Sequence, residues 1–398
     1  MKNNKILEIP QKAAIEYLKK GGKLGSIDNS DEPSAIDLSL NPLFYPPRHV
    51  YEEGIFAVKN YLERYPNSMV DSNDVSILLI GNQEAGKTSL VHMISGKISS
   101  AEEIKLEDRT QCFDVQSTWI EEVKVDMRDI GGHDEYLSCL GLLGRDESLN
   151  ITVINPRDLK DENSLESALW SWTEKLLEVS TTPHLLIVIS KMDTIDEKEQ
   201  QDEKECMMQK LEAFFEKKLE EVKNSRECKK AIIEKDIKEN ETKLEEASKE
   251  RELLESCPTA SLEKKQEWLA KALRCEARKQ LLQNKLSKQI YKINHLPNFN
   301  PDCITFVSSM TGAGFDRLEK NLLKAINKLP KIKLQEHWMK TVELLLTSYH
   351  DQSFVLFQDL LNYSDLSQED LCEMLKALSA MGRVIWSPDL DEYQVIFH

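Results

Sequence analysis

The chain carries the apolar run VSILLI from Val75 to Ile80, followed at once by GNQEAGKT from Gly81 to Thr88. A short apolar run of this kind is typical of a buried strand, and the GxxxxGKT spacing is typical of a phosphate-binding loop that opens a helix. Two glycines let the backbone turn tightly, so that successive N–H groups face phosphate oxygens at the positive end of the next helix. We therefore expect a strand, a phosphate-binding loop and a helix. The alternative is a chance glycine-rich turn.

Each polar residue type in this loop has a chemical reason to be there. Lys87 is expected to reach the β- and γ-phosphates of a nucleotide, and the hydroxyl of Thr88 to ligate Mg²⁺. The rest of the loop is expected to line the phosphates through its backbone. The predicted nucleotide contacts are Gly81, Asn82, Gln83, Glu84, Ala85, Gly86, Lys87, Thr88 and Ser89.

A second polar group follows two predicted strands, over residues 112–121 and 123–127. It begins with Asp129 and continues to Gly131 and Gly132. A carboxylate at the end of a strand holds Mg²⁺ through water, and glycines after it let a loop approach the γ-phosphate. His133 comes next and would orient the attacking water; the alternative is a loop histidine with no catalytic part. We count Asp129 as a metal ligand and Gly132 as a nucleotide contact.

A third group of residues is expected to recognise the base of the nucleotide. The predicted strand His184 to Ile189 ends in Ser190-Lys191-Met192-Asp193. The Asp193 carboxylate accepts two hydrogen bonds from guanine that adenine does not offer, and the Lys191 stem covers the base plane. After the last predicted strand, over residues 303–307, backbone groups at Ser308, Ser309 and Met310 would donate to the guanine carbonyl. Alone, SKMD favours a surface turn after a strand; in order with the other motifs it favours guanine.

Composition restricts the functional class. The chain has 398 residues, which is enough for two or three domains, and a formal net charge of -17, which argues against unassisted binding of nucleic acid. No stretch is apolar enough to span a membrane or to form a signal peptide. The eight cysteines form no CxxC pair, so we expect reduced thiols in a cytoplasmic protein rather than zinc ligands or disulfides.

The segments between and around these motifs differ in character. Residues 197–295 are rich in Glu and Lys and predict a helical hairpin with a break near Cys257-Pro258-Thr259, one arm about 90 Å long if unbroken. This hairpin is either a partner-binding or dimerising coiled coil, or two arms that bury each other. Before the first motif, Ile36 to Leu43 has the alternation of a leucine-rich-repeat strand, or of an ordinary strand ending at a proline, and a helix ends near Tyr65.

Residues 331–398 predict a separate module. One helix contains Trp338 to Tyr349, a shorter helix spans Phe354 to Leu361, and a third ends near Gly382. Two strands then pair across a turn, which gives a winged-helix-like pattern. The third helix is acidic rather than basic, so we expect this module to bind protein and not DNA.

The ordered motifs resemble the nucleotide-binding boxes of Ras-like GTPases. The segment from Met381 to Trp386 looks like a hairpin of the COR domain, and the whole is similar to the Roc-COR tandem of Roco proteins, which include leucine-rich-repeat kinases and death-associated protein kinase. The resemblance implies an α/β, Ras-like P-loop GTPase fold with a mostly parallel sheet, a long helical insertion and a C-terminal winged-helix-like α+β segment. It divides the chain into residues 1–70, a leucine-rich-repeat-like end; 71–330, the Roc domain; and 331–398, the first part of COR.

The resemblance also implies binding of GTP, GDP and Mg²⁺, slow hydrolysis of GTP, and dimerisation where COR is complete. Protein partners would use the helical insertion and the COR segment. Gln83 and Glu84 stand where many small GTPases carry glycine, which would obstruct an external arginine finger. Thr110, with Thr118 as second choice, would be the switch threonine on Mg²⁺, and Arg109 would neutralise charge in cis or be a solvated loop residue. The alternatives are a nucleotide-bound scaffold with negligible turnover and an ATP-using regulatory module.

Overall fold

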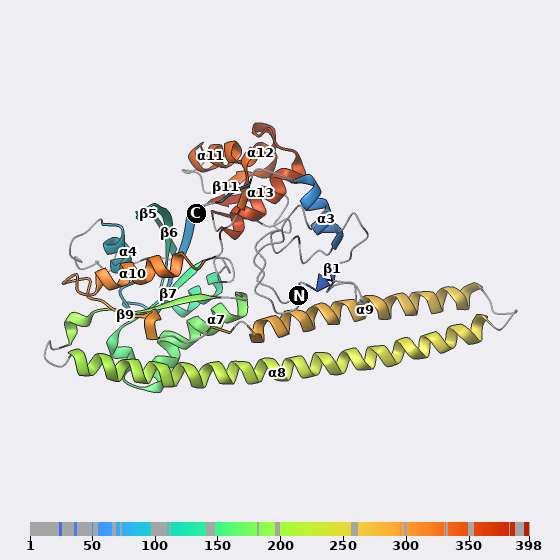
Figure 1. Cartoon of the computed structure of the whole chain (residues 1–398), viewed down its shortest axis with the longest axis horizontal. Coiled ribbons are helices and arrows are strands. Elements are labelled where there is room, and N and C mark those ends of the chain that lie inside the picture. The colour runs from blue at the N-terminus through green and yellow to red at the C-terminus, as the bar shows by residue number, and fades with distance from the viewer. Residues whose placement is uncertain are drawn as a thin grey trace. The chain divides into compact units, whose positions relative to one another are not determined.

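The computed structural model of the chain (Figure 1) describes residues 24–25, 36–37, 50, 55–65, 69–71, 74–96, 110, 113–140, 148–180, 183–195, 200–255, 262–294, 296–297, 301–329, 331, 333–348, 354–381, 383–386 and 394–397. The chain forms two compact units. One combines Met1–Pro66 with Glu220–His295, and the other combines Asn67–Leu219 with Leu296–His398. The expected boundaries at residues 70 and 330 stay predictions.

The larger unit is built on a six-stranded sheet in the order β5-β6-β4-β7-β8-β9. All neighbours pair in parallel except β5 and β6, which form an antiparallel pair. This mostly parallel sheet with helices confirms the predicted Ras-like α/β fold. The strands are β4 (Asp74–Ile80), β5 (Phe113–Ile120), β6 (Val123–Ile130), β7 (Leu149–Ile154), β8 (His184–Ile189) and β9 (Ile304–Phe306).

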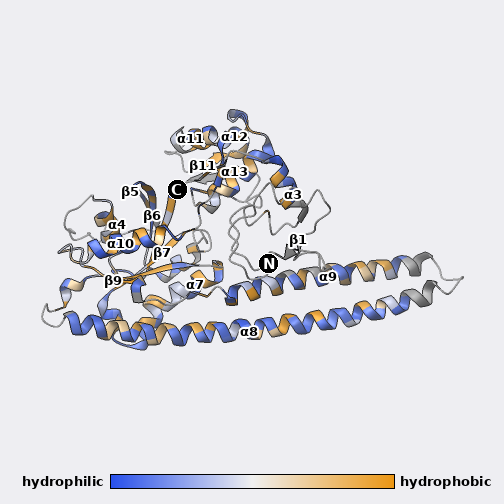
Figure 2. Ribbon diagram, viewed as in Figure 1, coloured by the Kyte–Doolittle hydropathy of each residue, from blue (hydrophilic) through white to orange (hydrophobic). Residues whose placement is uncertain are grey.

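Side chains alternate along each strand, so each strand contributes apolar side chains to both faces of the sheet. Helices pack on both of these faces. On β4, Ile77 and Leu79 pack in the cluster that includes Leu90 of α4 (Lys87–Ile94) and Leu318 of α10 (Phe315–Ile326). Leu78 and Ile80 pack on the other face, with Trp172 and Leu176 of α7 (Ser171–Val179). Figure 2 shows the apolar colouring of the central strands between helices with more polar surfaces. A strand buried on both faces explains the continuous apolar run from Val75.

The segment after β7 differs from the single helix that the sequence predicts. It consists of η3 (Pro156–Leu159), α6 (Glu162–Leu165), the π-helical turn η4 (Glu166–Trp170) and α7. Side chains of α6, η4 and α7 are buried as expected, Leu169 and Trp172 among them. The π turn was not anticipated because a single added residue barely alters the apolar spacing. The short η2 (Asp134–Cys139), η5 (Met192–Thr194) and η6 (Pro301–Cys303) lie elsewhere in this unit.

The C-terminal part of this unit contains two further small sheets. Strand β10 (Lys333–Gln335) pairs with β3 (Met69–Asp71) in antiparallel fashion, and β13 (Gln394–Phe397) lies between β11 (Phe354–Leu356) and β12 (Val384–Ile385). The expected pairing of the last two strands is therefore present. The expected helix over 354–361 is wrong at its start, because 354–356 is a strand. The helical elements here are η7 (Glu336–Trp338), α11 (Met339–Ser348), α12 (Phe357–Tyr363) and α13 (Gln368–Ala380).

One arginine ties this C-terminal part to the large sheet. Arg383 forms ion pairs with Asp74 on β4, at 2.5 Å, and with Asp126 on β6. The side chains of Arg383 and Asp126 are 8% and 10% exposed, so this is a largely buried pair. Ser117 of β5 also donates to Asp126, at 2.6 Å. The winged-helix identity of the segment stays a prediction, and Gly382, its expected helix cap, lies outside the described residues.

In the smaller unit the helical insertion has the predicted hairpin form. Helix α8 (Gln200–Glu255) contributes its part from Glu220 onward, and α9 (Leu262–Asn294) lies beside it. Polar side chains cap backbone carbonyls between the arms: Trp268 Nε1 donates to Ala247 O at 2.6 Å, and Asn240 Nδ2 to Cys275 O at 2.8 Å. The expected break at Cys257-Pro258-Thr259 lies outside the described residues.

The other described elements of the smaller unit are one helix and two short strands. The expected helix ending near Tyr65 is α3 (Ile55–Arg64). Of the leucine-rich-repeat-like stretch only β2 (Ile36–Asp37) is described, paired in parallel with β1 (Leu24–Gly25), and residues 38–43 lie outside the described residues. Within the described ranges, no helix combines the length and the apolar composition that a membrane crossing requires.

Candidate nucleotide-binding site

The loop between β4 and α4 curls around the ammonium group of Lys87. Lys87 Nζ donates to Gly81 O at 2.7 Å and to Asn82 O at 2.9 Å, so the lysine caps the loop from inside. Gly86 precedes the helix with φ 95°, a left-handed conformation that favours glycine and turns the loop into the first turn of α4. The predicted strand, loop and helix arrangement is present, and the loop leads directly into the N-terminus of α4.

The loop after β6 lies directly against this phosphate-binding loop. Gln83 N donates to Gly132 O at 3.1 Å. A Cβ built on Gly132 would lie 2.2 Å from Gln83 N and 2.4 Å from Asn82 C, so no side chain fits there without displacing backbone. The glycine predicted to let a loop approach the phosphates thus sits where two loops touch.

Three oxygen-bearing side chains predicted as Mg²⁺ ligands converge at the start of α4. Thr88 Oγ1 donates to Asp129 Oδ2 at 2.5 Å, and Thr110 Oγ1 donates to the same oxygen at 2.9 Å. The two hydroxyl oxygens are 3.2 Å apart. The three residues come from α4, β6 and the segment before β5, so the fold brings together side chains that lie far apart in the sequence. Thr118, the second candidate, lies in β5 opposite Val125 and outside this cluster.

Burial perturbs the two charged groups of the cluster. Lys87 is 6% exposed, and this burial lowers its pKa from 10.5 to about 8, against the opposing attraction of Asp129. Burial also raises the pKa of Asp129, while hydrogen bonds from Thr88 and the nearby Lys87 act in the opposite direction. The protein therefore places one cation and one carboxylate in a buried site, where each partly offsets the effect of burial on the pKa of the other.

The donor set is suited to Mg²⁺. This ion prefers oxygen ligands and commonly takes one or two carboxylates together with waters and phosphate oxygens. Asp129 Oδ1 is buried and, among the described residues, has no hydrogen-bond partner, which leaves a carboxylate oxygen for a metal-bound water. Thr88 and Thr110 supply two hydroxyl oxygens beside it. The residues present fit the ion that the loop motif implies.

The predicted base-reading residues lie after β8 and β9. Asp193 is exposed, and its Oδ1 accepts a hydrogen bond of 2.5 Å from Ser308 Oγ. Lys191 has φ 51°, a left-handed conformation that is uncommon for a residue with a side chain. Met192 N donates to Val307 O at 3.2 Å, which joins the two segments. Ser309 follows in the same turn, and Met310 is 55% exposed. The structure therefore brings the two predicted base-reading segments together.

Ser190 has a role that the sequence did not reveal. Its hydroxyl is buried and donates to Ala85 O at 2.5 Å, with Ile154 O also within 3.1 Å. Gly86 lies close enough that an added Cβ would meet the Ser190 side chain at 3.5 Å. Ser190, the first residue of the base-reading motif, thus supports the backbone of the phosphate-binding loop.

Of the two predicted catalytic residues, His133 and Arg109, the structure describes His133. His133 is exposed, and its ring meets the Tyr136 ring edge to face at a centroid distance of 6.1 Å. Arg109 lies outside the described residues. Gln83 and Glu84 are exposed at the mouth of the loop, where Glu84 has φ 63°. Their exposure is compatible with the expected obstruction of an external arginine.

Sequence reasoning missed the side chains behind Asn82. Trp172 Nε1 donates to Asn82 Oδ1 at 3.2 Å, and Asn82 Nδ2 donates to Ser167 Oγ at 3.4 Å. Trp172 is fully buried, so its indole N–H needs an acceptor. That need was the only signal in the sequence, and it did not identify the acceptor.

Comparison with known families agrees with this geometry over part of the chain. Residues 76–234 match the model of the Gtr1/RagA G protein conserved region. This stretch contains the phosphate-binding loop, Asp129 and the Ser190 to Asp193 motif, and the match supports a G protein-type GTPase domain there. No curated protein matches the chain.

Solved structures that are similar to the chain include the following three. Methanosarcina barkeri Roco2 RocCORdC bound to GDP matches at 15% identity and TM-score 0.47, over 83% of this chain and 75% of the other. A bacterial selenocysteine-specific elongation factor, EF-Sec, matches at 20% identity and TM-score 0.27, over 36% and 24%. Translation elongation factor SelB from Methanococcus maripaludis, in complex with the GTP analogue GppNHp, matches at 13% identity and TM-score 0.32, over 65% and 35%.

Proposed function

We propose that the chain is a GTP-binding regulatory switch of the Roc-COR type that hydrolyses GTP slowly. The observation that carries this proposal is the convergence of Lys87, Thr88 and Asp129 at the phosphate-binding loop, with Asp193 exposed on the segment whose Ser190 donates to the same loop. The first group suits phosphates and Mg²⁺, and the carboxylate suits guanine.

In this proposal the chain's own residues divide the work of binding. Lys87 exchanges its two carbonyl partners for phosphate oxygens, which keeps its buried ammonium charged. Thr88, Thr110 and Asp129 hold Mg²⁺, which would neutralise charge that develops between the phosphates. Asp193 and the Lys191 stem select guanine. The C-terminal segment and the helical insertion contact protein partners, and dimerisation requires a complete COR domain.

The surroundings of His133, the predicted water-orienting residue, support the slow hydrolysis in this proposal. His133 is exposed, and its ring meets the Tyr136 ring edge to face. If His133 does not hold the attacking water, chemistry relies mainly on electrostatic stabilisation, which would make hydrolysis slow. The same observation favours a second candidate, a nucleotide-bound scaffold with negligible turnover.

Titration of the purified chain with labelled GTP, GDP and ATP, with and without Mg²⁺, tests the proposal. Tight, Mg²⁺-dependent binding of GTP and GDP with weak binding of ATP is expected. Equal affinity for ATP would contradict the guanine assignment and favour an ATP-using module. Single-turnover release of phosphate then separates the slow switch from the scaffold, which would bind GTP and release none.

A further inference from the structure

We propose that the π-helical turn η4 positions the phosphate-binding loop through Asn82, and that the beginning of α8 holds this turn in place, so that α8 sets the rate at which nucleotide leaves. The inference rests on the proposed nucleotide site and assigns to it positioning residues outside every motif. The side chains concerned are Ser167 and Trp172 next to the loop, and Glu166 and Lys218 behind them.

Asn82 is the point where this arrangement meets the loop. Its carbonyl accepts from Lys87 Nζ at 2.9 Å and from Ala85 N at 3.2 Å, so its backbone is part of the phosphate cradle. Its side-chain amide is held from outside by Trp172 and Ser167. A shift of Trp172, the donor, or of Ser167, the acceptor, therefore moves Asn82 and with it the carbonyl oxygen that accepts from Lys87 Nζ.

The π turn explains how two residues five positions apart reach one amide. In a regular α-helix each residue rotates by about 100°, so residues five apart point about 140° apart. In η4 the Ser171 backbone N–H donates to Glu166 O, the i to i+5 pattern, and the Ser171 hydroxyl donates to the same carbonyl at 3.0 Å. The extra residue in the turn brings Ser167 and Trp172 toward the same side. Isolated π turns of this kind are frequent at functional sites.

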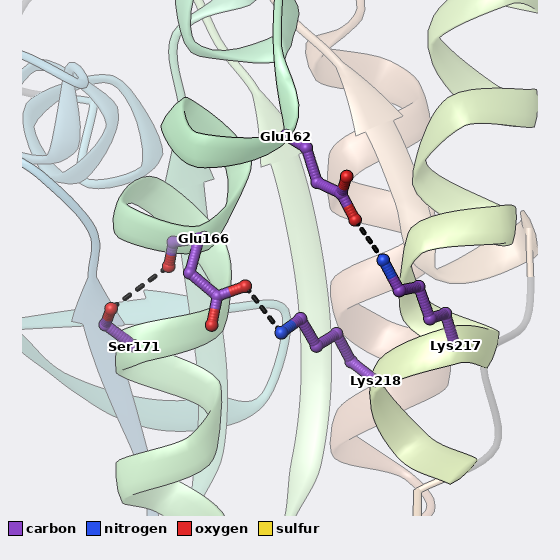
Figure 3. A network of polar contacts seen from close by, with 5 residues as sticks. All are labelled: Glu162, Glu166, Ser171, Lys217 and Lys218. Atoms are coloured by element: carbon purple, nitrogen blue, oxygen red, sulfur yellow. Dashed lines mark hydrogen bonds and ion pairs between the residues drawn. The ribbon is translucent and has the colours of Figure 1, made fainter. Parts of the chain in front are cut away.

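The first part of α8 clamps the outside of this turn, as Figure 3 shows. Lys218 Nζ lies 2.7 Å from Glu166 Oε2, and its side chain is only 14% exposed. The same ammonium lies 6.0 Å from the Trp170 ring centroid and 5.9 Å from that of Phe214. Phe215 meets Trp170 edge to face at 6.0 Å. The clamp therefore combines a half-buried ion pair with aromatic contacts.

The neighbouring ion pair offers a matched control. Lys217 pairs with Glu162 one turn earlier, on α6, and both side chains are more than half exposed, at 56% and 61%. Glu162 is the first residue of α6 and precedes the π turn, whereas Glu166 is the first residue of the turn. Removing either lysine deletes one positive charge from adjacent positions of the same helix, and only one of the two deletions loosens η4.

The experiment compares release of labelled GDP from the full chain and its variants at 25 °C. Lys218→Ala is expected to release GDP about threefold to tenfold faster than wild type, as loss of a partly buried pair implies, and Lys217→Ala less than about twofold faster. The exchange Lys218→Glu with Glu166→Lys is expected to release GDP more slowly than either single substitution. Equal release from Lys218→Ala and Lys217→Ala would overturn the inference.

A second arm tests the path through Asn82. Ser167→Ala changes an exposed side chain, so folding is preserved, and it is expected to speed GDP release; Asn163→Ala, exposed on α6, is the control and should leave release unchanged. The double variant Ser167→Ala with Lys218→Ala should be no faster than the faster single variant, since both act through one path. Additive acceleration would overturn the shared path.

Two readouts separate the possible failures. A purely structural role of Lys218 would lower the melting temperature of Lys218→Ala with no change in the GDP release rate, and that result contradicts the inference. If the wild-type chain binds no guanine nucleotide, the proposed function itself has failed. If wild type binds GDP and the four single alanine variants release it at the wild-type rate, only the positioning role has failed.

Discussion

The two ends of the candidate site are built on opposite principles. At the phosphate end, Lys87 and Asp129 are 6% and 2% exposed, and protein groups occupy their bonding positions before any ligand arrives. At the base end, Asp193 is exposed and Met310 is 55% exposed, with Ser308 as the partner that orients the carboxylate. A buried charge gains most from a ligand of opposite charge, so affinity should reside at the first end and selectivity at the second.

The largest effect is expected where burial is deepest. Lys87→Ala should weaken binding of GTP and GDP by about a hundredfold to a thousandfold, since it removes the ammonium group that is proposed to contact the phosphate oxygens. Equilibrium titration measures this loss. Retention of tight binding would remove the distinction between the two ends.

The same variant separates binding from folding. Burial holds the pKa of Lys87 near 8, below its value of 10.5 in the unfolded chain, so at pH 7 protonated Lys87 costs folding free energy. That cost is largest below pH 8 and disappears as the pH rises through 10.5. Lys87→Ala should therefore melt at or above the wild-type temperature at pH 7, measured without nucleotide. A lower melting temperature would mean that lost binding reflects misfolding.

The base end should control the choice of nucleotide. Asp193→Asn is expected to shift the ratio of GTP to XTP affinity by about a hundredfold toward XTP, because the amide can donate to the xanthine carbonyl but cannot accept both guanine N–H groups. Competition of GTP and XTP for the labelled site measures the ratio. Asp316→Asn, exposed in the first turn of α10, is the matched control. An unchanged ratio would refute the guanine assignment.

Raising the pH should weaken only the phosphate end. With the pKa of free Lys87 at about 8, nucleotide affinity should fall about tenfold between pH 7 and pH 9, because binding then requires uptake of a proton. Titrations at five pH values give the slope. Lys191→Ala, at the base end, should show the same slope at a lower overall affinity. A flat profile for wild type would show that the ammonium stays charged without ligand.

The smallest expected effect sharpens the metal assignment. Thr110→Ala should reduce the Mg²⁺ dependence of GTP affinity by about threefold to fivefold, since its hydroxyl contacts the Asp129 carboxylate at 2.9 Å. Thr118→Ala is the control. It also removes a threonine hydroxyl, but Thr118 lies in β5 outside that cluster, so the Mg²⁺ dependence should stay unchanged. Titration of Mg²⁺ at fixed GTP distinguishes them. Equal effects would leave the switch threonine unassigned.

The sequence was informative wherever one residue type suffices for the chemistry. The loop spacing, Asp129 and the apolar strands predicted the sheet, the phosphate-binding loop and the cluster at Thr88, since each follows from local pattern. It was uninformative where a contact depends on the register of a distant element. The π turn shifts Ser167 and Trp172 onto Asn82, and nothing in the spacing of Leu165, Leu169 and Trp172 distinguishes it from a regular helix.

Two other misses have the same origin. Ser190 resembled a weakened version of the base-reading motif, yet its hydroxyl supports Ala85, which is 105 residues earlier in the chain. The strand β11 resembled the start of a helix because Phe354 to Leu356 is too short for its period to be read, and its partner β13 lies forty residues later. Pairing with a remote partner decided both cases, as is usual for short segments.

The ion pairs of Arg383 decide where a truncated fragment of the protein should end. A boundary drawn at residue 330 would leave Asp126 almost buried on β6 without the guanidinium that neutralises it, and Asp74 nearby with the same charge. Removing one partner of a buried pair is commonly more costly than never having had it. The evolutionary module and the autonomously stable fragment therefore need not coincide, and expression trials should retain the chain through Trp386.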